Sequence, residues 1–157
     1  MAGSGAPETG GVDASGLNIV VIAGTWHEII TDGLIAGAKR VLDATGAAYR
    51  VVRVPGSFEL PVAARAAFEG GADAVVALGV IIRGGTPHFE FVSAAATDGL
   101  TRVALDAGKP VGFGVLTLDD EQQGLDRAGL EGSKEDKGEE AADAAIRTAL
   151  VLRELRG

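Results

Sequence analysis

The stretch AVVALGVIIRGGTPHFE, residues 74–90, decides the fold of this chain. Its first nine residues are uncharged and rich in valine and isoleucine, which is typical of a strand covered on both faces. A turn with two glycines and a proline follows, and a helix is predicted from about His88 onward. Strand, turn and helix in this order form the unit of a parallel α/β sheet.

The same unit repeats on either side of this stretch. Strands are predicted at residues 17–23, 49–54, 74–82 and 111–116. Helices are predicted at residues 28–44, 59–69, 88–107 and 119–127, and a last helix follows a charged link at residues 129–138 and ends near Arg156. Gly46 is placed to end the first helix, and Pro61 falls in the first turn of the second, where proline is tolerated.

This alternation predicts an α/β fold. Right-handed crossovers place helices on both faces of a parallel sheet, so we expect a flavodoxin-like three-layer sandwich with four strands in the order 2-1-3-4. In such sheets a ligand lies beyond the carboxyl ends of the strands, where the strand order reverses. That rule selects two loops, residues 24–28 and 83–90.

The composition excludes several classes of function. The net charge of −8 argues against binding to nucleic acid or to anionic membranes. The chain has no cysteine, which excludes disulfides, thiolate nucleophiles and cysteine-based zinc sites. Its two histidines, His27 and His88, are too few for a histidine-rich metal site.

The first 16 residues differ in composition from the rest. Residues 1–16 are rich in glycine, alanine and serine, and they lack the basic start and apolar run of a secretory signal. No apolar stretch is long enough to span a membrane. We therefore expect a flexible tail at residues 1–16, followed by a cytoplasmic domain at residues 17–157.

The two loops contain the candidate functional residues. Gly85 and Thr86 could bind a phosphate through backbone N–H groups and a hydroxyl, although a plain glycine-rich turn would look similar. His88 could carry protons, or it could merely cap the helix or bond a backbone group. Trp26 could stack a heteroaromatic ring or serve as core packing. His27 is interpreted as structural or as a surface residue.

Other polar residues allow two interpretations each. Glu59 suits a helix N-terminus, but its carboxylate, with exposed N–H groups of the loop at residues 55–61, could also bond the polar edge of a ring lying on Trp26. Arg127 suits a helix C-terminus and could equally bind phosphate. Lys137 falls in the charged link and is expected to be solvated. Phe113 falls inside the fourth strand, so a core position is expected within one chain.

Four blocks in the right order resemble the lumazine synthase family. They are VPGSFELP at residues 54–61, ALGVIIRGGTPHF at 77–89, GFGVLT at 112–117 and LDRAG at 125–129. The resemblance runs from about residue 17 to residue 155, so it implies a lumazine synthase domain at residues 17–157.

The resemblance implies a reaction and a set of site residues. The reaction joins 5-amino-6-(D-ribitylamino)uracil to 3,4-dihydroxy-2-butanone 4-phosphate and releases phosphate and water, without a metal or organic cofactor. It is the penultimate step of riboflavin biosynthesis, and His88 would be its proton carrier. The substrate-binding residues would be Trp26, Ser57, Phe58, Glu59, Val80, Ile81, Ile82, Gly85, Thr86, Phe113, Arg127 and Lys137. Of these, Phe113 and Lys137 would come from the adjacent subunit.

The resemblance also implies homo-oligomers. Members of the family form pentamers, some of which close into sixty-subunit icosahedral shells. The link at residues 129–138 is longer than the turn of shell-forming members, which favours an isolated pentamer. Riboflavin synthase is the implied protein partner.

Three rival functions fit the same fold less well. An FMN-binding electron carrier needs a phosphate loop rich in serine and threonine after the first strand, and GTWHE at residues 24–28 is a poor match. A phosphoacceptor domain needs an acidic pair after the first strand and an aspartate after the third, and the sequence has neither. A member of the family that only binds flavin or acts as a scaffold is disfavoured because Trp26, His88 and Arg127 are all present.

Overall fold

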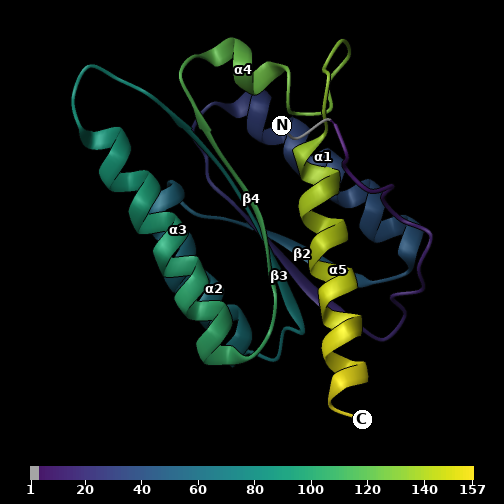
Figure 1. Cartoon of the computed structure of the whole chain (residues 1–157). Coiled ribbons are helices and arrows are strands. Elements are labelled where there is room, and N and C mark those ends of the chain that lie inside the picture. The colour runs from purple at the N-terminus through teal and green to yellow at the C-terminus, as the bar shows by residue number, and fades with distance from the viewer. Residues whose placement is uncertain (1–3) are drawn as a thin grey trace.

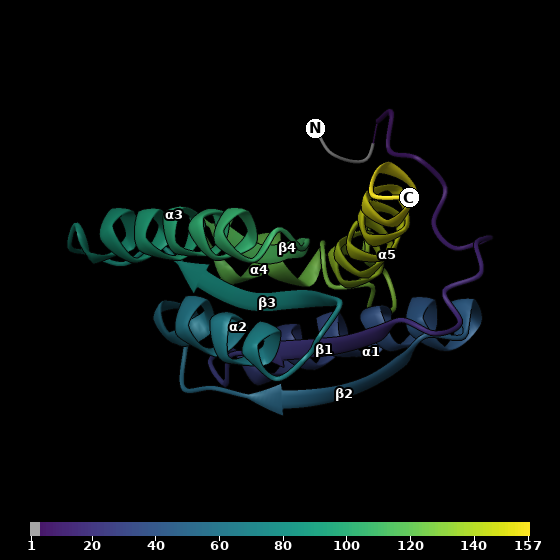
Figure 2. The same cartoon turned by 90° about the horizontal axis from the view of Figure 1, so that it is seen from below.

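Four parallel strands form the central layer of the computed structural model, which describes residues 4–157. They are β1 (Asn18–Ala23), β2 (Ala48–Arg53), β3 (Ala74–Ile82) and β4 (Val111–Leu118). Their spatial order is β2-β1-β3-β4, as predicted, and Figure 2 shows the strands side by side in this order. The register places Ala77 of β3 opposite Ile22 of β1 and Phe113 of β4.

Helices cover both faces of the sheet, which confirms the three-layer α/β prediction. They are α1 (Glu28–Thr45), α2 (Leu60–Glu69), α3 (His88–Ala107), α4 (Glu121–Leu125) and α5 (Lys137–Leu155). Figure 1 shows α2 and α3 on one side of the sheet and α1 and α5 on the other, with α4 beyond the end of β4. None of the helices within residues 4–157 has the length and apolar content that crossing a bilayer requires.

The core divides into two layers because alternate strand residues point to opposite faces. Val21 and Leu78 pack with Leu34 and Ile146 in the layer under α1 and α5. Val20 and Val75 pack with residues of α2 and α3 in the other. The central strand β3 contributes to both layers, which explains its uninterrupted apolar sequence.

The helix boundaries follow their capping residues. Gly46 ends α1 with a left-handed φ of 79°, as predicted. The carboxylate of Asp120 accepts a hydrogen bond from the N–H of Gln123, so α4 begins later than predicted. Asp136 caps α5 in the same way, and the expectation that the link extends through residue 138 is wrong because Lys137 already belongs to the helix.

Part of the segment before β1 lies against α5. The backbone N–H of Gly10 donates to Asp143 at 2.8 Å, and the Arg147 guanidinium donates to the carbonyl of Gly10. Ala14 is buried, and its N–H donates to the carbonyl of Thr45. The flexibility expected of residues 1–16 stays a prediction, and residues 1–3 lie outside the described part of the chain.

Candidate functional site

A cleft of about 670 Å³ opens where the strand-order rule predicts a ligand, at the carboxyl ends of β1 and β3. It lies between the loops that follow β1 and β2 and the first turns of α3. Its lining residues are Trp26, His27, Gly56, Ser57, Phe58, Glu59, Val80, Ile81, Ile82, His88, Phe91 and Val92. Eight of these are among the thirteen site residues that the sequence suggested.

Trp26 presents its indole to this cleft. The side chain is 67% exposed, so the alternative that it is core packing is wrong. The indole lies on the backbone of Gly56, where a Cβ atom would be only 3.2 Å from Cδ1 and Nε1 of Trp26. Glycine at this position lets the ring lie close to the next loop, which leaves a flat aromatic surface open to a ligand.

The loop after β2 brings a polar turn to the same cleft. Residues Ser57–Glu59 form a short 3₁₀ helix that leads into α2. Ser57 is buried against β3, where a Cβ atom at Gly79 would lie 2.4 Å from its Oγ. Phe58 is exposed and Glu59 is half-buried at the cleft. The cleft is therefore mostly apolar, with a few hydrogen-bonding groups at its edge.

His88 enters the cleft from the first residue of α3. It does not cap the helix, because the residue before it, Pro87, occupies the N-cap position. The hydroxyl oxygen of Thr86 accepts a long hydrogen bond of 3.4 Å from the backbone N–H of His88. Gly85 and Thr86 are exposed beside the cleft, but they do not line it.

Arg83, the cation at the start of this loop, already forms ion pairs with carboxylates of the same chain. Arg83 lies 2.6 Å from Glu90 and 3.0 Å from Asp119, and its guanidinium sits 4.3 Å from the ring centre of Phe89. The hydrogen bond from Arg83 lowers the pKa of Glu90. Arg83 thus fixes the ends of the loop, and a phosphate at Gly85 would need its cation from another residue.

Phe113 lies away from the cleft, and the expectation that it belongs to the core is wrong. Its side chain is 47% exposed. Along β4 the residues alternate, with Gly112 and Gly114 against Ala141 of α5 and Phe113 on the opposite face. Because β4 is an edge strand and α3 does not cover this position, the ring is open to solvent in a single chain.

Arg127 and Lys137 also lie outside the cleft, and both face Glu135. Lys137 Nζ is 3.0 Å from Glu135 and 3.0 Å from Glu140, while Arg127 Nε is 3.8 Å from Glu135. Burial acts to lower the pKa of Lys137, but hydrogen bonds to the two carboxylates outweigh it and raise that pKa. The expectation that Lys137 is solvated is therefore wrong, because its side chain is only 19% exposed.

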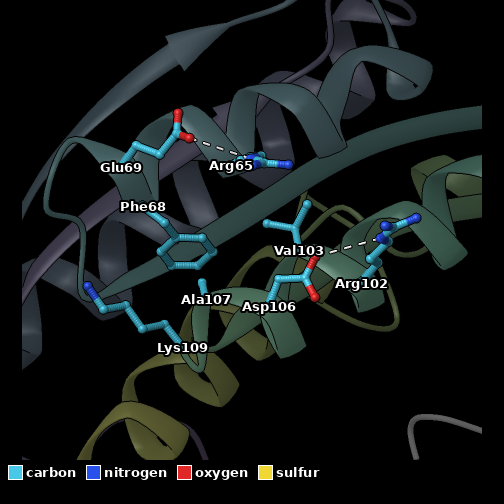
Figure 3. Close-up of a pocket in the computed structure, with 8 residues that line it drawn as sticks. All are labelled: Arg65, Phe68, Glu69, Arg102, Val103, Asp106, Ala107 and Lys109. Carbon is cyan, nitrogen blue, oxygen red and sulfur yellow. Dashed lines mark ion pairs between the residues drawn. The ribbon is translucent and has the colours of Figure 1, made fainter.

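A second hollow, of about 330 Å³, lies between the C-terminal halves of α2 and α3 (Figure 3). Its charges are paired with each other: Arg65 lies 3.5 Å from Glu69, and Arg102 lies 3.6 Å from Asp106. Lys109 donates to the carbonyl of Ala72. With its cations engaged, this hollow offers no group comparable to the indole and imidazole of the cleft.

Sequence analysis missed four residues of the cleft. Phe91 and Val92 follow His88 by three and four positions, so helical spacing alone could have found them. Gly56 lies in the block at residues 54–61 that resembles the family, and His27 is next to Trp26. Within residues 4–157 there is no cluster of three His, Cys, Asp or Glu side chains that could hold a metal ion.

Comparisons with known proteins agree on one family. The sequence model described as 6,7-dimethyl-8-ribityllumazine synthase matches residues 16–153. The chain is 72% identical to the protein of that name from Leifsonia xyli subsp. xyli, with both chains covered completely. It is 69% identical to the one from Clavibacter michiganensis subsp. michiganensis, covering 100% of this chain and 99% of the relative. Identity to the one from Streptomyces avermitilis is 57%, over 98% of this chain and 96% of the relative.

Proposed function

The chain belongs to the 6,7-dimethyl-8-ribityllumazine synthase family, and from this premise we propose that the cleft around Trp26 and His88 is half of its active site. As a transferase of this family it condenses 5-amino-6-(D-ribitylamino)uracil with 3,4-dihydroxy-2-butanone 4-phosphate in riboflavin biosynthesis. The convergence of an exposed indole and an imidazole on one cleft is the observation that carries the proposal.

In this proposal the pyrimidine substrate lies on Trp26. The indole is flat and exposed, and the apolar wall of Val80, Ile81 and Ile82 excludes water from the other side of the ring. The 3₁₀ turn at Ser57–Glu59 holds the ribityl chain and the polar edge of the ring. These groups align the substrate, and alignment supplies most of the acceleration of a reaction between two small polar molecules.

The phosphate of the second substrate lies at the loop before α3. Gly85 and Thr86 offer exposed backbone N–H groups at a helix N-terminus, where an anion is favoured. Arg83 is held by Glu90 and Asp119, so Arg127 of a neighbouring chain supplies the guanidinium. Phe113 and Lys137 of that neighbour close the cleft.

His88 carries protons between the two substrates. The amine of the pyrimidine attacks the ketone and forms an imine with loss of one water, the phosphate leaves, and the ring closes with loss of a second water. Each step moves a proton to or from nitrogen or oxygen, and an imidazole can both donate and accept near neutral pH. The position of His88 beside the phosphate loop suits this role.

The proposed site needs a second copy of the chain, and the resemblance to the family makes a homopentamer the assembly that we propose. The exposure of Phe113 on an edge strand supports contact with a second copy. The link before α5, which ends at residue 136 in the structure, is still the feature that favours isolated pentamers over sixty-subunit shells. Light scattering that detects only sixty-subunit particles would contradict the pentamer.

The absence of cysteine in the sequence supports a cytoplasmic location, and riboflavin synthase is the partner that consumes the product.

The test is an assay with both substrates, in which product absorbance and released phosphate are followed together. We expect one phosphate per product, at a rate well above the uncatalysed background and unchanged by a metal chelator. Turnover at the background rate would leave only a scaffold or flavin-binding function for this chain.

A further inference from the structure

The loop that carries Trp26 and His27 is fixed by hydrogen bonds at both ends. Thr25 Oγ1 donates to the carbonyl of Pro55 at 2.7 Å, and the Arg53 guanidinium donates to the carbonyl of Gly24 at 2.9 Å. Beyond the loop, Thr31 Oγ1 donates to the carbonyl of Trp26 at 2.7 Å. The neighbouring structure therefore dictates the backbone conformation at residue 27.

His27 adopts a backbone conformation that is uncommon for a residue other than glycine. Its φ is 55° and its ψ is 65°, and within residues 4–157 it is the only residue other than glycine with a positive φ. Glycine is the usual choice in this left-handed region, and asparagine, aspartate and histidine are the other residues found there most often. His27 occupies the N-cap position of α1, but its side chain makes no capping hydrogen bond. Histidine tolerates this region better than most residues do, but glycine and asparagine tolerate it as well, and capping does not explain the imidazole.

The imidazole of His27 lies in the cleft beside the indole. The two ring centres are 6.5 Å apart, with their planes tilted by 43°. Both residues line the cleft, together with Glu59 and His88. A ligand stacked on Trp26 would thus present its edge to His27.

We propose that His27 is a substrate-binding residue that hydrogen-bonds the pyrimidine substrate stacked on Trp26. This inference rests on the proposed site and adds a recognition group to it. A neutral imidazole has one N–H donor and one nitrogen acceptor, and the edge of a uracil ring alternates carbonyl oxygens with N–H groups. The two histidines then have different roles: His27 binds the pyrimidine, and His88 transfers protons. Residues in sparsely populated backbone conformations cluster at ligand sites, which agrees with the position of His27 in the cleft.

The test uses His27→Gly and His27→Asn in the full-length protein. Glycine removes the ring and relieves the backbone, and asparagine keeps a donor and an acceptor while tolerating positive φ. For His27→Gly we expect the KM of the pyrimidine to rise about tenfold, as for one lost hydrogen bond, without a lower melting temperature. The turnover number and the KM of the phosphorylated substrate should stay within about twofold, and His27→Asn should recover most of the pyrimidine KM.

Two outcomes would overturn the inference. A pyrimidine KM unchanged in His27→Gly would mean that the ring makes no contact with the substrate. Equal losses for both substrates, in both variants, would mean that the loop geometry matters and the imidazole does not.

Trp26→Ala separates this failure from that of the proposed site: if it also leaves the pyrimidine KM unchanged, the cleft itself is wrongly assigned. Binding of the pyrimidine alone can be followed in the wild type and the His27 variants by the fluorescence of Trp26, the only tryptophan in the chain.

Discussion

The cleft and the three remote residues Phe113, Arg127 and Lys137 differ in what they offer a substrate. The cleft is aromatic and aliphatic, and the side chains that line it include no lysine or arginine. The remote residues include two cations and an exposed aromatic ring. A phosphorylated substrate needs both kinds of surface, because a stacking platform alone does not neutralise a phosphate.

This difference teaches where the second half of the site must come from. In one chain the remote cations face Glu135 and do not line the cleft. A neighbouring copy that placed its β4 and the start of its α5 against the cleft would combine the two surfaces. If the halves come from different chains, variants in each half should fail separately and recover activity when mixed.

The largest effect is expected for His88→Ala. Removing a general acid–base group lowers rates by about 10² to 10⁴. Since alignment by the rest of the cleft remains, turnover should fall without reaching the uncatalysed rate, and the KM values should change little. Steady-state kinetics with both substrates measure this. Glu69→Gln is the control, because Glu69 is 67% exposed, lies outside the cleft and should leave both turnover and the KM values unchanged. A His88→Ala enzyme as fast as the wild type would remove the proton carrier from the mechanism.

Arg127→Ala is expected to have the next largest effect. The lost charge-assisted contact is worth about 1.5–3 kcal/mol, which corresponds to roughly 10- to 150-fold in kcat/KM. The loss should fall on the phosphorylated substrate and spare the pyrimidine. Unchanged dependence on the phosphorylated substrate would contradict the assignment of Arg127.

Mixing the two variants tests whether the halves come from different chains. Chains with His88→Ala and chains with Arg127→Ala, refolded together, would form hybrid pentamers in which about a quarter of the interfaces pair two intact halves. We expect activity above the average of the separate variants. Activity equal to that average would place both halves of the site in one chain.

The sequence predicted the cleft better than the remote residues, for physical reasons. The buried run of β3 and the strand-order rule identify an edge of the sheet without any knowledge of side-chain contacts. Phe113 was misjudged because alternation along a strand says which face a residue points to, but not how far a neighbouring helix covers that residue at the edge of the sheet. Lys137 was misjudged because it was assigned to the charged link. In the structure Asp136 caps α5 and Lys137 begins the helix, but in the sequence this aspartate looks like any other charged residue of the link.

The smallest effect is expected for Glu135→Gln, which removes the negative charge that Arg127 and Lys137 face. Glu135 is 13% exposed and lies 3.0 Å from Lys137. Losing its charge should destabilise the protein by about 1 to 2 kcal/mol at pH 7, between the values typical of exposed and of buried pairs. The hydrogen bond to Glu135 helps to raise the pKa of Lys137 above 10.5, so the stabilisation is fully present below that pH. It should be lost as the pH rises through the raised pKa.

Urea unfolding of the wild type and Glu135→Gln, from pH 7 to about pH 11, measures this dependence. Glu69→Gln is the matched control, because its pair with Arg65 is 67–70% exposed and its loss should change stability by less than about 0.5 kcal/mol. A difference that stays constant through pH 11 would mean that the carboxylate acts by packing and not through Lys137. If Glu135→Gln also raises the KM of the phosphorylated substrate by a few fold, Glu135 positions the cations for a neighbouring cleft. An unchanged KM would restrict Glu135 to folding and leave Arg127 to orient itself through its bond to the carbonyl of Gln123.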